Sequence, residues 1–386
     1  MNEEAAKALA AAPTDPTPEK PLRRARYRGR NPRHFREKYK EFQPDRYSDD
    51  VAKVIAGGKT PAGTHRPVML AEILGVLVPR PGEIAVDCTV GYGGHARALL
   101  AAVQPGGRLL GLDADPIELP KTESRLRGLG LPPESIVLRR MNFAALPRFL
   151  AAEAPEGADL LLADLGLSSM QIDDPARGFS FKEAGPLDMR MNPTRGRPAS
   201  ALLSELGESA LAEILAENSD QPHARELASA IHRAHAREPL LTTQALVAVV
   251  CDASARWTGV SDRTGDDPVR RVFQALRIAV NDEFGALTEF LRTLPTCLRP
   301  GGRVAILSFH SGEDRRVKSA FKEGLRAGRY VSIAEEVIRP SAEEKRENPR
   351  SSSAKLRFAV HGYRARRQVR PDVPLGHSRA LVLTEV

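Results

Sequence analysis

The stretch IAVDCTVGYGGHARALLAAVQPGGRLLGLDAD, residues 84–115, decides the fold of this chain. A short apolar run ends at Asp87 and is followed by a turn rich in glycine. Helix-forming residues then occupy 95–103, and a second apolar run, 109–112, ends at Asp113. This order of strand, turn, helix and strand predicts a parallel βαβ unit, and with it a doubly wound, Rossmann-like α/β fold.

The glycine-rich turn also predicts a ligand site at the carboxyl ends of these strands. Glycine lets backbone N–H groups approach a ligand closely, and Asp113 can accept hydrogen bonds from both hydroxyls of a ribose. We therefore expect a cofactor that contains adenosine. A dinucleotide fits because Gly91-x-Gly93-x-x-Ala96 matches the loose fingerprint. S-adenosylmethionine fits as well, because Asp87 suits its cationic amino-acid end.

Composition excludes several classes of protein. At 386 residues the chain can form two compact units, and it has no run of about 20 apolar residues that could cross a membrane. Its three cysteines are isolated, which favours a reducing compartment, here the cytoplasm, over a disulfide framework or a zinc site. Histidines 223, 232 and 235 lie near one another without a cysteine or carboxylate pattern to complete a site, so we expect no metal.

The positive charge is concentrated near the N-terminus. Residues 20–40 hold ten Lys or Arg and one Glu, a net +9, whereas the whole chain carries +8. Tyr27, Phe35 and Tyr39 lie between these cations. Basic side chains neutralise phosphates and aromatic rings stack on unpaired bases, so the segment has the character of an RNA-binding arm. A solvated basic tail is an equally good interpretation.

Further strands are predicted at 135–138, 159–163, 303–307, 330–337 and 355–360, which gives a mostly parallel sheet of seven strands. Three side chains that follow predicted strands are candidates for chemistry. Phe143 could stack on an adenine. Backbone carbonyls from Asp164 to Gly166, or the Ser168 hydroxyl, could hold an amine that accepts a methyl group. His310 could contact the target base, although a buried structural histidine is the commoner case.

Between the fourth and fifth strands, residues 172–268 show apolar side chains at helical spacing, which predicts an inserted helical domain. Pro222 is expected in a first helical turn. The entrance to the insert is a loop rich in Gly and Pro that suits a lid over an RNA substrate. Its candidate substrate-binding residues are Arg177, Phe179, Asp188 and Arg190; the alternative is that its aromatic rings only pin the insert to the sheet.

The chain resembles the bacterial small-subunit (16S) rRNA (cytosine-N4)-methyltransferases of the MraW/RsmH family. The matching segments follow one another from about residue 65 to 360: His65-Arg-Pro-Val-Met-Leu70, Asp87-x-Thr-x-Gly-x-Gly-Gly-His95, Leu112-Asp-x-Asp-Pro116, Asp164-Leu-Gly-x-Ser-Ser-x-Gln171, Asp173-Asp-Pro-x-Arg-Gly-Phe-Ser-Phe181, Gly185-Pro-Leu-Asp-Met-Arg-Met191, Phe273-Gln-Ala-Leu-Arg-Ile278, Ser308-Phe-His-Ser-x-Glu-Asp-Arg315 and Asn348-Pro-Arg-x-x-Ser-Ala-Lys-Leu-Arg357. Family members usually carry Arg where this chain has Tyr92 and Leu where it has Gly312.

The resemblance implies a class I S-adenosylmethionine-dependent methyltransferase fold and methyl transfer to the exocyclic amine of one cytidine in the decoding region of small-subunit rRNA. The cofactor-binding positions that it implies are Gly93, Gly94, His95, Asp113, Phe143, Asp164 and Gln171. Asp164, Ser168 and His310 are the candidate catalytic residues. The implied partner is the rRNA or the assembled small subunit, with no membrane; the oligomeric state stays open, a homodimer included.

The predicted organisation has five parts: a basic extension (1–62), the first part of the methyltransferase domain (63–171), the insert (172–268), the second part (269–360) and a tail (361–386). Two other functions stay open. The glycine fingerprint alone would permit an NAD-dependent oxidoreductase. A non-catalytic RNA-binding or ribosome assembly factor could keep the fold without the activity.

Overall fold

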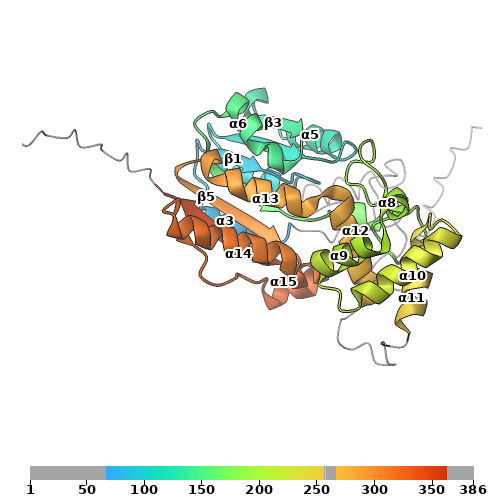
Figure 1. The fold of residues 1–386 in the computed structure, drawn as a ribbon. Helices are drawn as coiled ribbons and strands as arrows, with labels where there is room; N and C mark the ends of the chain where they lie inside the picture. Colours follow the sequence, from blue (N-terminus) through green and yellow to red (C-terminus); the bar gives the residue numbers. More distant parts are fainter. Residues whose placement is uncertain (1–66, 256, 258–266, 363–386) are drawn as a thin grey trace, which may run out of the picture.

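The computed structural model describes residues 67–255, 257 and 267–362, in which a seven-stranded sheet forms the centre (Figure 1). The strand order is β3-β2-β1-β4-β5-β7-β6. Strand β7 runs antiparallel to both β5 and β6, and all other neighbouring strands are parallel. The doubly wound α/β fold with a mostly parallel sheet is thus confirmed. The strands are β1 (Ile84–Asp87), β2 (Arg108–Asp113), β3 (Ile136–Arg140), β4 (Ala158–Asp164), β5 (Leu298–Ser308), β6 (Tyr330–Ile333) and β7 (Lys355–His361).

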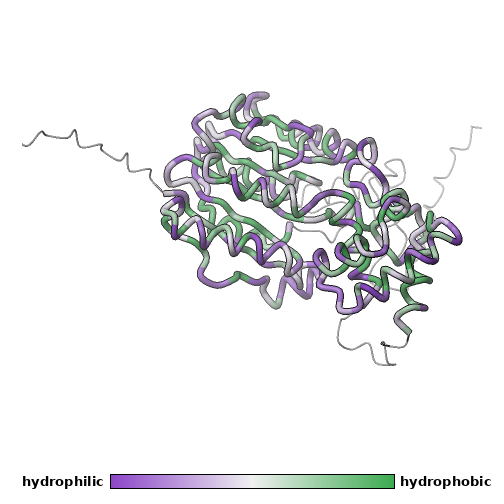
Figure 2. The backbone as a smooth tube through the Cα atoms, viewed as in Figure 1, coloured by the Kyte–Doolittle hydropathy of each residue, from purple (hydrophilic) through white to green (hydrophobic). Residues whose placement is uncertain are grey.

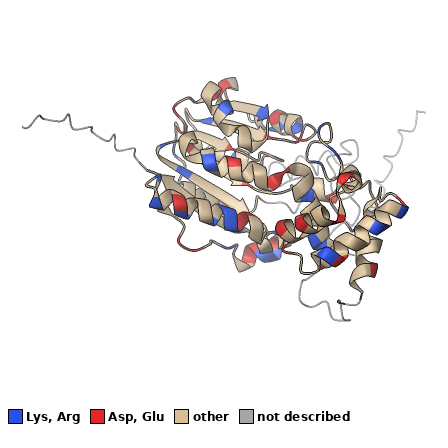
Figure 3. Ribbon diagram, viewed as in Figure 1, with Lys and Arg blue, Asp and Glu red and all other residues tan. Residues whose placement is uncertain are grey.

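Helices cover both faces of this sheet. On one face α3 (Leu70–Leu77), α4 (Gly94–Val103) and α5 (Leu119–Arg127) pack against the strands; on the other lie α6 (Leu146–Glu153), α13 (Glu283–Thr293) and α14 (Ser311–Arg326). The hydropathy of the chain follows these layers, because the strands are apolar and the helices are apolar toward the strands (Figure 2). Charged residues of both signs lie on the outer helices (Figure 3).

Strand β4 shows why the sheet is stable. Leu160 and Leu162 are fully buried in the cluster on the α4 side, and Leu161 and Ala163 are fully buried in the cluster on the α13 side. Alternate side chains of a strand point to opposite faces, so a continuous apolar run is the pattern of a strand covered on both sides. Burial of each such leucine contributes roughly 1.5–3 kcal/mol, which fixes the position of the polar loop that follows at Asp164.

The insert between β4 and β5 is helical, as its sequence pattern predicts. It begins with α7 (Ser169–Asp173) and a loop, and its helices are α8 (Ala199–Glu205), α9 (Glu208–Ser219), α10 (Ala224–Arg237) and α11 (Thr243–Ser254). Pro222 does not lie in a helical turn, because α9 ends at Ser219 and α10 begins at Ala224. The rings of His223 and Trp257 stack in parallel, 4.1 Å apart, beside the insert's core.

Helix α12 (Pro268–Asn281) shares the hydrophobic core of the insert. Its buried Val272, Phe273 and Leu276 belong to the same cluster as the apolar side chains of α9, α10 and α11. A boundary at residue 268 would separate this helix from its core. We therefore propose that the insert extends to the end of α12 and that the methyltransferase domain resumes with α13.

The last strands differ in detail from the sequence pattern. The fifth strand, predicted at 303–307, begins earlier, at Leu298, and its register against β4 shifts between Ala158 and Leu160. Strand β6 ends at Ile333, and Ile338 forms only an isolated bridge with Leu356. The remaining helix of this region is α15 (Ala342–Glu347). Among the described residues no helix combines the length and the apolar character needed to span a membrane. The basic segment 20–40 lies outside the described residues.

Candidate active site

A single cleft runs along the carboxyl ends of β1, β2, β4 and β5. Its volume is about 1150 Å³. Pockets for one small molecule measure about 300–1,000 Å³, so this cleft has room for a cofactor and a base together. Its lining includes most of the residues that the sequence singles out: Gly93, Gly94, His95, Asp113, Phe143, Asp164, Ser168, Gln171, Phe179 and His310.

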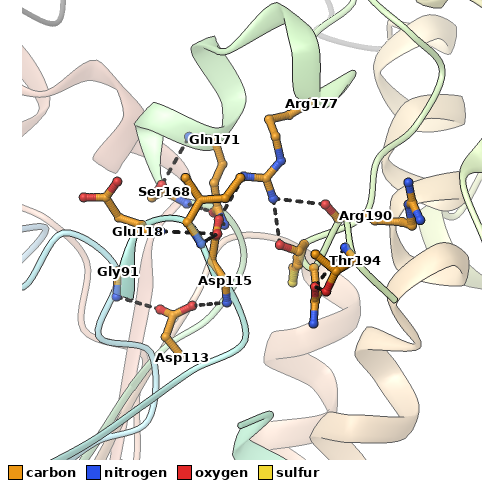
Figure 4. Close-up of polar contacts among 12 residues, drawn as sticks. Gly91, Asp113, Asp115, Glu118, Ser168, Gln171, Arg177, Arg190 and Thr194 are labelled. Atoms are coloured by element: carbon orange, nitrogen blue, oxygen red, sulfur yellow. Dashed lines mark hydrogen bonds and ion pairs between the residues drawn. The ribbon is translucent and has the colours of Figure 1, made fainter. Parts of the chain in front are cut away.

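Asp113 occupies the end of β2 and faces the glycine turn (Figure 4). Its carboxylate accepts hydrogen bonds from the backbone N–H groups of Gly91, at 2.7 Å, and Asp115, at 2.8 Å. Burial raises the pKa of Asp113, although the two backbone donors oppose this. Each carboxylate oxygen keeps a further lone pair for a ribose hydroxyl, and the contact of Asp113 with the ribose stays a prediction.

The glycines of the turn are needed for packing as well as for ligand approach. A Cβ on Gly93, whose φ is +90°, would lie 2.6 Å from Cγ2 of Thr122. A Cβ on Gly94 would lie 2.6 Å from Cγ of Pro67. A side chain at either position would therefore displace the turn from α5 or from the segment before α3. Both glycines line the cleft, and their cofactor contacts stay predictions.

Two carboxylates lie near His95 beneath the turn, the buried Asp87 and the partly exposed Asp164. Nδ1 of His95 lies 3.5 Å from Oδ2 of Asp164, and its Nε2 lies 3.0 Å from the carbonyl oxygen of Val68. Burial raises the pKa of Asp164 to about 7, with Glu313 adding to the rise, and burial raises the pKa of Asp87 to about 6. Burial lowers the pKa of His95. The cluster therefore disfavours its own negative charge.

One oxygen of each carboxylate, Oδ2 of Asp87 and Oδ1 of Asp164, is buried without a hydrogen-bond partner among the described residues. A buried polar atom without a partner is costly in a folded protein. A bound cation beside these atoms would remove that cost and favour both ionised forms. The sulfonium and ammonium groups of S-adenosylmethionine carry such charge, so Asp164, which lines the cleft, fits that cofactor, and Asp87 lies beneath the lining.

Ser168 and Gln171 form a capping box at the start of α7 (Figure 4). The Ser168 hydroxyl accepts a hydrogen bond from the backbone N–H of Gln171, and the Gln171 side chain accepts one from the backbone N–H of Ser168. The Gln171 amide also donates to Asp115 at 2.8 Å. Both side chains thus hold the loop after β4 in shape. Ser168 keeps its hydroxyl hydrogen, so its predicted contact with an amine stays a prediction.

Arg177 is a buried tie between the loop of the insert and the cofactor end of the cleft (Figure 4). It donates to Oδ2 of Asp115 at 2.9 Å and to the carbonyl oxygens of Arg190 and Met191. Burial alone would raise the pKa of Asp115, but the hydrogen bonds, led by that from Arg177, hold it below its ordinary value. The structure gives Arg177 an intramolecular role, and it does not line the cleft.

Of the other residues predicted to contact the substrate or the adenine, some line the cleft and others do not. Asp188 and Arg190 pair with each other at 2.7 Å and hold their own loop; neither lines the cleft. Phe179 lines the cleft, but it is buried and belongs to the core of the insert. Phe143 packs edge-on against Phe290 of α13, with the ring centroids 5.3 Å apart, and stays in reach of an adenine as a lining residue. No finding tests the substrate contacts of these residues.

The carboxyl end of β5 carries a charged cluster to which the sequence analysis assigns only His310. Nε2 of His310 lies 3.2 Å from Oε1 of Glu313, which also accepts the backbone N–H of Phe309 through Oε2. Arg277 of α12 binds Glu283 through two hydrogen bonds, 2.7 and 2.8 Å long. Arg277 and Glu313 lie within quoted family segments, but their contacts join α12, α13 and α14, which no local pattern reveals.

Ligand atoms of Glu283, His310 and Glu313 lie within 4.8 Å of one another, which is a spacing compatible with a cation. The guanidinium of Arg277 already holds both oxygens of Glu283. A metal ion would have to share those oxygens with a positive charge. The donor set therefore does not fit a resident metal.

Comparison with known proteins identifies the family. The model of the MraW methylase family matches residues 62–361. Ribosomal RNA small subunit methyltransferase H 2 of Alkaliphilus metalliredigens is 48% identical over 347 residues, which are 89% of this chain and 98% of that protein. Ribosomal RNA small subunit methyltransferase H 1 of Lachnoclostridium phytofermentans is 45% identical over 359 residues, 92% of this chain and 97% of that protein.

A solved structure with a weaker likeness is an S-adenosylmethionine-dependent O-methyltransferase from Thermotoga maritima. It is 11% identical, covers 76% of this chain and 65% of its own, and has a TM-score of 0.35. The family does not rest on that likeness. The family model spans the cleft from the glycine turn to the end of β7, and it decides between the two adenosine cofactors in favour of S-adenosylmethionine. This chain belongs to the MraW methylase family and is an S-adenosylmethionine-dependent methyltransferase.

Proposed function

We propose that the protein transfers the methyl group of S-adenosylmethionine to the exocyclic N4 amine of a cytidine in the decoding region of small-subunit (16S) rRNA. The main support is that Asp113, proposed to bind the ribose, and Asp164, proposed to bind the amine, line the same cleft. Relatives at 45–48% identity that are named ribosomal RNA small subunit methyltransferases support the RNA substrate.

Asp164 is the residue best suited to receive the amine. When bound, S-adenosylmethionine supplies an electrophilic methyl group on a cationic sulfur. Asp164 lies at the carboxyl end of β4 with one buried oxygen free, and an ionised carboxylate accepts an N–H hydrogen bond. Its pKa of about 7 matches a general base that works near neutral pH.

The same carboxylate can take the proton that the amine releases. Asp164 would be ionised while the sulfonium charge of the cofactor lies beside it. Methyl transfer removes that charge from the sulfur, and the proton affinity of Asp164 then rises again. The amine needs to lose a proton only at that later moment. Asp164 therefore gains proton affinity when the reaction requires an acceptor, and no metal or covalent intermediate is needed.

Two exposed cations at the rim of the cleft suit the RNA backbone. Lys182 lies within the loop at the entrance to the insert, and Arg270 belongs to the first turn of α12; both line the cleft. Within the described part of the chain neither side chain has a recorded ion pair. They are free to bind phosphate, and the basic segment 20–40 would add further contacts. We propose that the assembled small subunit in the cytoplasm is the physiological substrate, whereas a homodimer stays a prediction.

The decisive experiment is nucleoside mapping by mass spectrometry of small-subunit rRNA from cells with and without the gene. N4-methylcytidine should disappear without the gene and return with the wild-type copy. An Asp164→Asn copy should not restore it, whereas an Arg292→Gln copy, altered on the exposed surface of α13, should. Unchanged N4-methylcytidine in the deletion strain would refute the proposed substrate and leave a non-catalytic role as the better account.

A further inference from the structure

The far end of the cleft is formed by four ionisable side chains that the proposed chemistry does not use. We define the Arg277 wall as Arg277, Glu283, His310 and Glu313, all of which line the cleft. The side chains are 18%, 10%, 12% and 4% exposed. Burial of this many charges is costly unless each charge is paired. A buried cluster of ion pairs is therefore weak evidence for a stabilising role, and a role in binding has to be considered.

Within the Arg277 wall, each carboxylate holds a hydrogen-bond donor in place. Glu283 binds Arg277 at 2.7 and 2.8 Å through both of its oxygens. Glu313 lies 3.2 Å from His310, and the ring of His310 also packs against Phe284 at 5.7 Å between centroids. A Cβ at Gly312 would lie 2.6 Å from the Phe284 ring and 3.3 Å from Nδ1 of His310. A glycine at position 312 therefore leaves room for this packing.

The charge of the Arg277 wall argues against an RNA phosphate as its ligand. One guanidinium faces two carboxylates, and contacts with His310 and Arg277 outweigh burial and hold the pKa of Glu313 below its ordinary value. A phosphate would meet more negative than positive charge here. The edge of a base is neutral, and its hydrogen-bonding groups can use the donors that remain.

The donors that remain match one edge of cytosine. A guanidinium has five N–H groups, and the hydrogen bonds to Glu283 use two of them. The contact with Glu313 occupies Nε2 of His310, and Nδ1 of a neutral ring is then an acceptor, so the three remaining N–H groups of Arg277 are the donors of this wall. Cytosine presents two neighbouring acceptors, N3 and O2, beside its amine. A base whose N3 and O2 face the Arg277 wall would turn its amine away from these donors, toward the acceptors at the end of β4.

We propose that Arg277 binds the N3 and O2 edge of the target cytosine through its remaining N–H groups, that Glu283 is the positioning residue for it, and that Glu313 holds His310 beside them. This inference rests on the proposed function. Uracil carries an N–H at position 3 and a carbonyl at position 4. Its N3–H donor would face the N–H donors of Arg277, and its O4 acceptor would face the carboxylate of Asp164. A site built for one hydrogen-bond pattern rejects the inverse pattern strongly, because buried polar groups are then left unpaired.

The test measures the binding of free cytidine and free uridine to the full-length protein saturated with S-adenosylhomocysteine, by saturation-transfer NMR, which detects millimolar affinities. The altered protein is the double variant Arg277→Met, Glu283→Met, which removes both charges of the pair and so leaves no unpaired buried ion. The matched control is Arg292→Met, Glu289→Met, an Arg–Glu pair with equally short hydrogen bonds on the exposed surface of α13.

We expect the wild-type protein and the control to prefer cytidine over uridine. In the Arg277 variant, cytidine affinity should fall roughly 10- to 150-fold, the effect of one charge-assisted hydrogen bond, while S-adenosylhomocysteine affinity is kept. Equal binding of the two nucleosides by the wild type, no binding of either, cytidine affinity retained by the variant, or joint loss of both ligands would each overturn the inference. The nucleoside mapping described above tests the methyl transfer separately.

Discussion

The affinity of the protein for S-adenosylmethionine should fall as the pH falls below 7, because Asp164 lines the cleft and must ionise to face the positive charges of the cofactor, and Asp87 lies buried beneath it. Burial raises the pKa values of these groups to about 7 and about 6. Below its pKa each carboxyl is protonated and neutral, and it attracts a cation only weakly. The perturbation is therefore the pH itself, and the variant Asp164→Asn removes the group with the higher pKa.

The size of the effect follows from the fraction of protein that is ionised. If only Asp164 must lose its proton, affinity should fall roughly 100-fold between pH 8 and pH 5; if Asp87 must as well, the fall is roughly 1,000-fold. The free protein should show the opposite sign. The pKa of Asp164 rises from 3.8 to about 7 on folding, so the folded state holds a proton that the unfolded state has lost. Stability of the free protein should therefore decrease by about 3 kcal/mol as the pH rises from 4 to 7.

Titration calorimetry in two buffers of different protonation enthalpy measures both the affinity and the number of protons released. At pH 6.5 we expect net proton release on binding of S-adenosylmethionine. S-adenosylhomocysteine, which lacks the sulfonium charge, should show a weaker pH dependence, and Asp164→Asn should keep at most the roughly tenfold part due to Asp87. An affinity that does not change between pH 5 and pH 8, or proton uptake on binding, would refute this reasoning.

Four further predictions test single contacts. Asp113→Ala should weaken S-adenosylmethionine binding roughly 10- to 150-fold by calorimetry, and an unchanged affinity in a folded variant would refute the ribose assignment. Ser168→Ala should cost about 0.5–2 kcal/mol of stability in urea through loss of the helix cap, and should lower single-turnover methylation more than cofactor affinity; unchanged methylation would leave Ser168 a purely structural role. Arg177→Met leaves the buried Asp115 without its ion-pair partner, so the unfolding free energy should fall by about 3–5 kcal/mol. A loss below about 1 kcal/mol would mean that the ion pair of Arg177 and Asp115 contributes little to stability. Deletion of residues 1–60 should leave cofactor binding intact. If six cations of the basic segment bind single-stranded phosphate, the deletion should lower the slope of log K against log salt by about four units in filter binding to small-subunit rRNA. Equal slopes for the two proteins would make the segment a solvated tail.

The sequence predicts the sheet well because its evidence is local. Residues 84–86 and 160–163 are continuous apolar runs, each followed by an acid, and this pattern is typical of parallel strands that are buried on both faces. The capping box of Ser168 and Gln171 is also local, since Ser-x-x-Gln is its recognised spacing. The spacing of Ser168 and Gln171 therefore predicts the start of a helix independently of any role of these residues in chemistry.

Long-range pairing limits the prediction of the site. Arg177 sits in a loop whose composition suits RNA, but its partner Asp115 lies 62 residues earlier in the chain. An arginine that binds phosphate and an arginine buried in an ion pair have the same local signature. The same holds for Arg277 and for Glu313, whose neighbours come from three different helices. Amphipathic α12 posed a related problem, because periodicity shows that a face is buried but not which core buries it.

The stacked pair of Trp257 and His223 makes the insert visible on its own in solution. The chain contains one tryptophan, and that residue packs beside the core of the insert, remote in sequence from every strand of the sheet. Fluorescence during a denaturant titration therefore follows the insert, whereas circular dichroism follows the helices and strands of the whole molecule. Coincident transitions would show that insert and sheet unfold as one cooperative unit. An earlier fluorescence transition would show that the insert can open while the cofactor-binding sheet stays folded, and S-adenosylmethionine would then delay only the second transition.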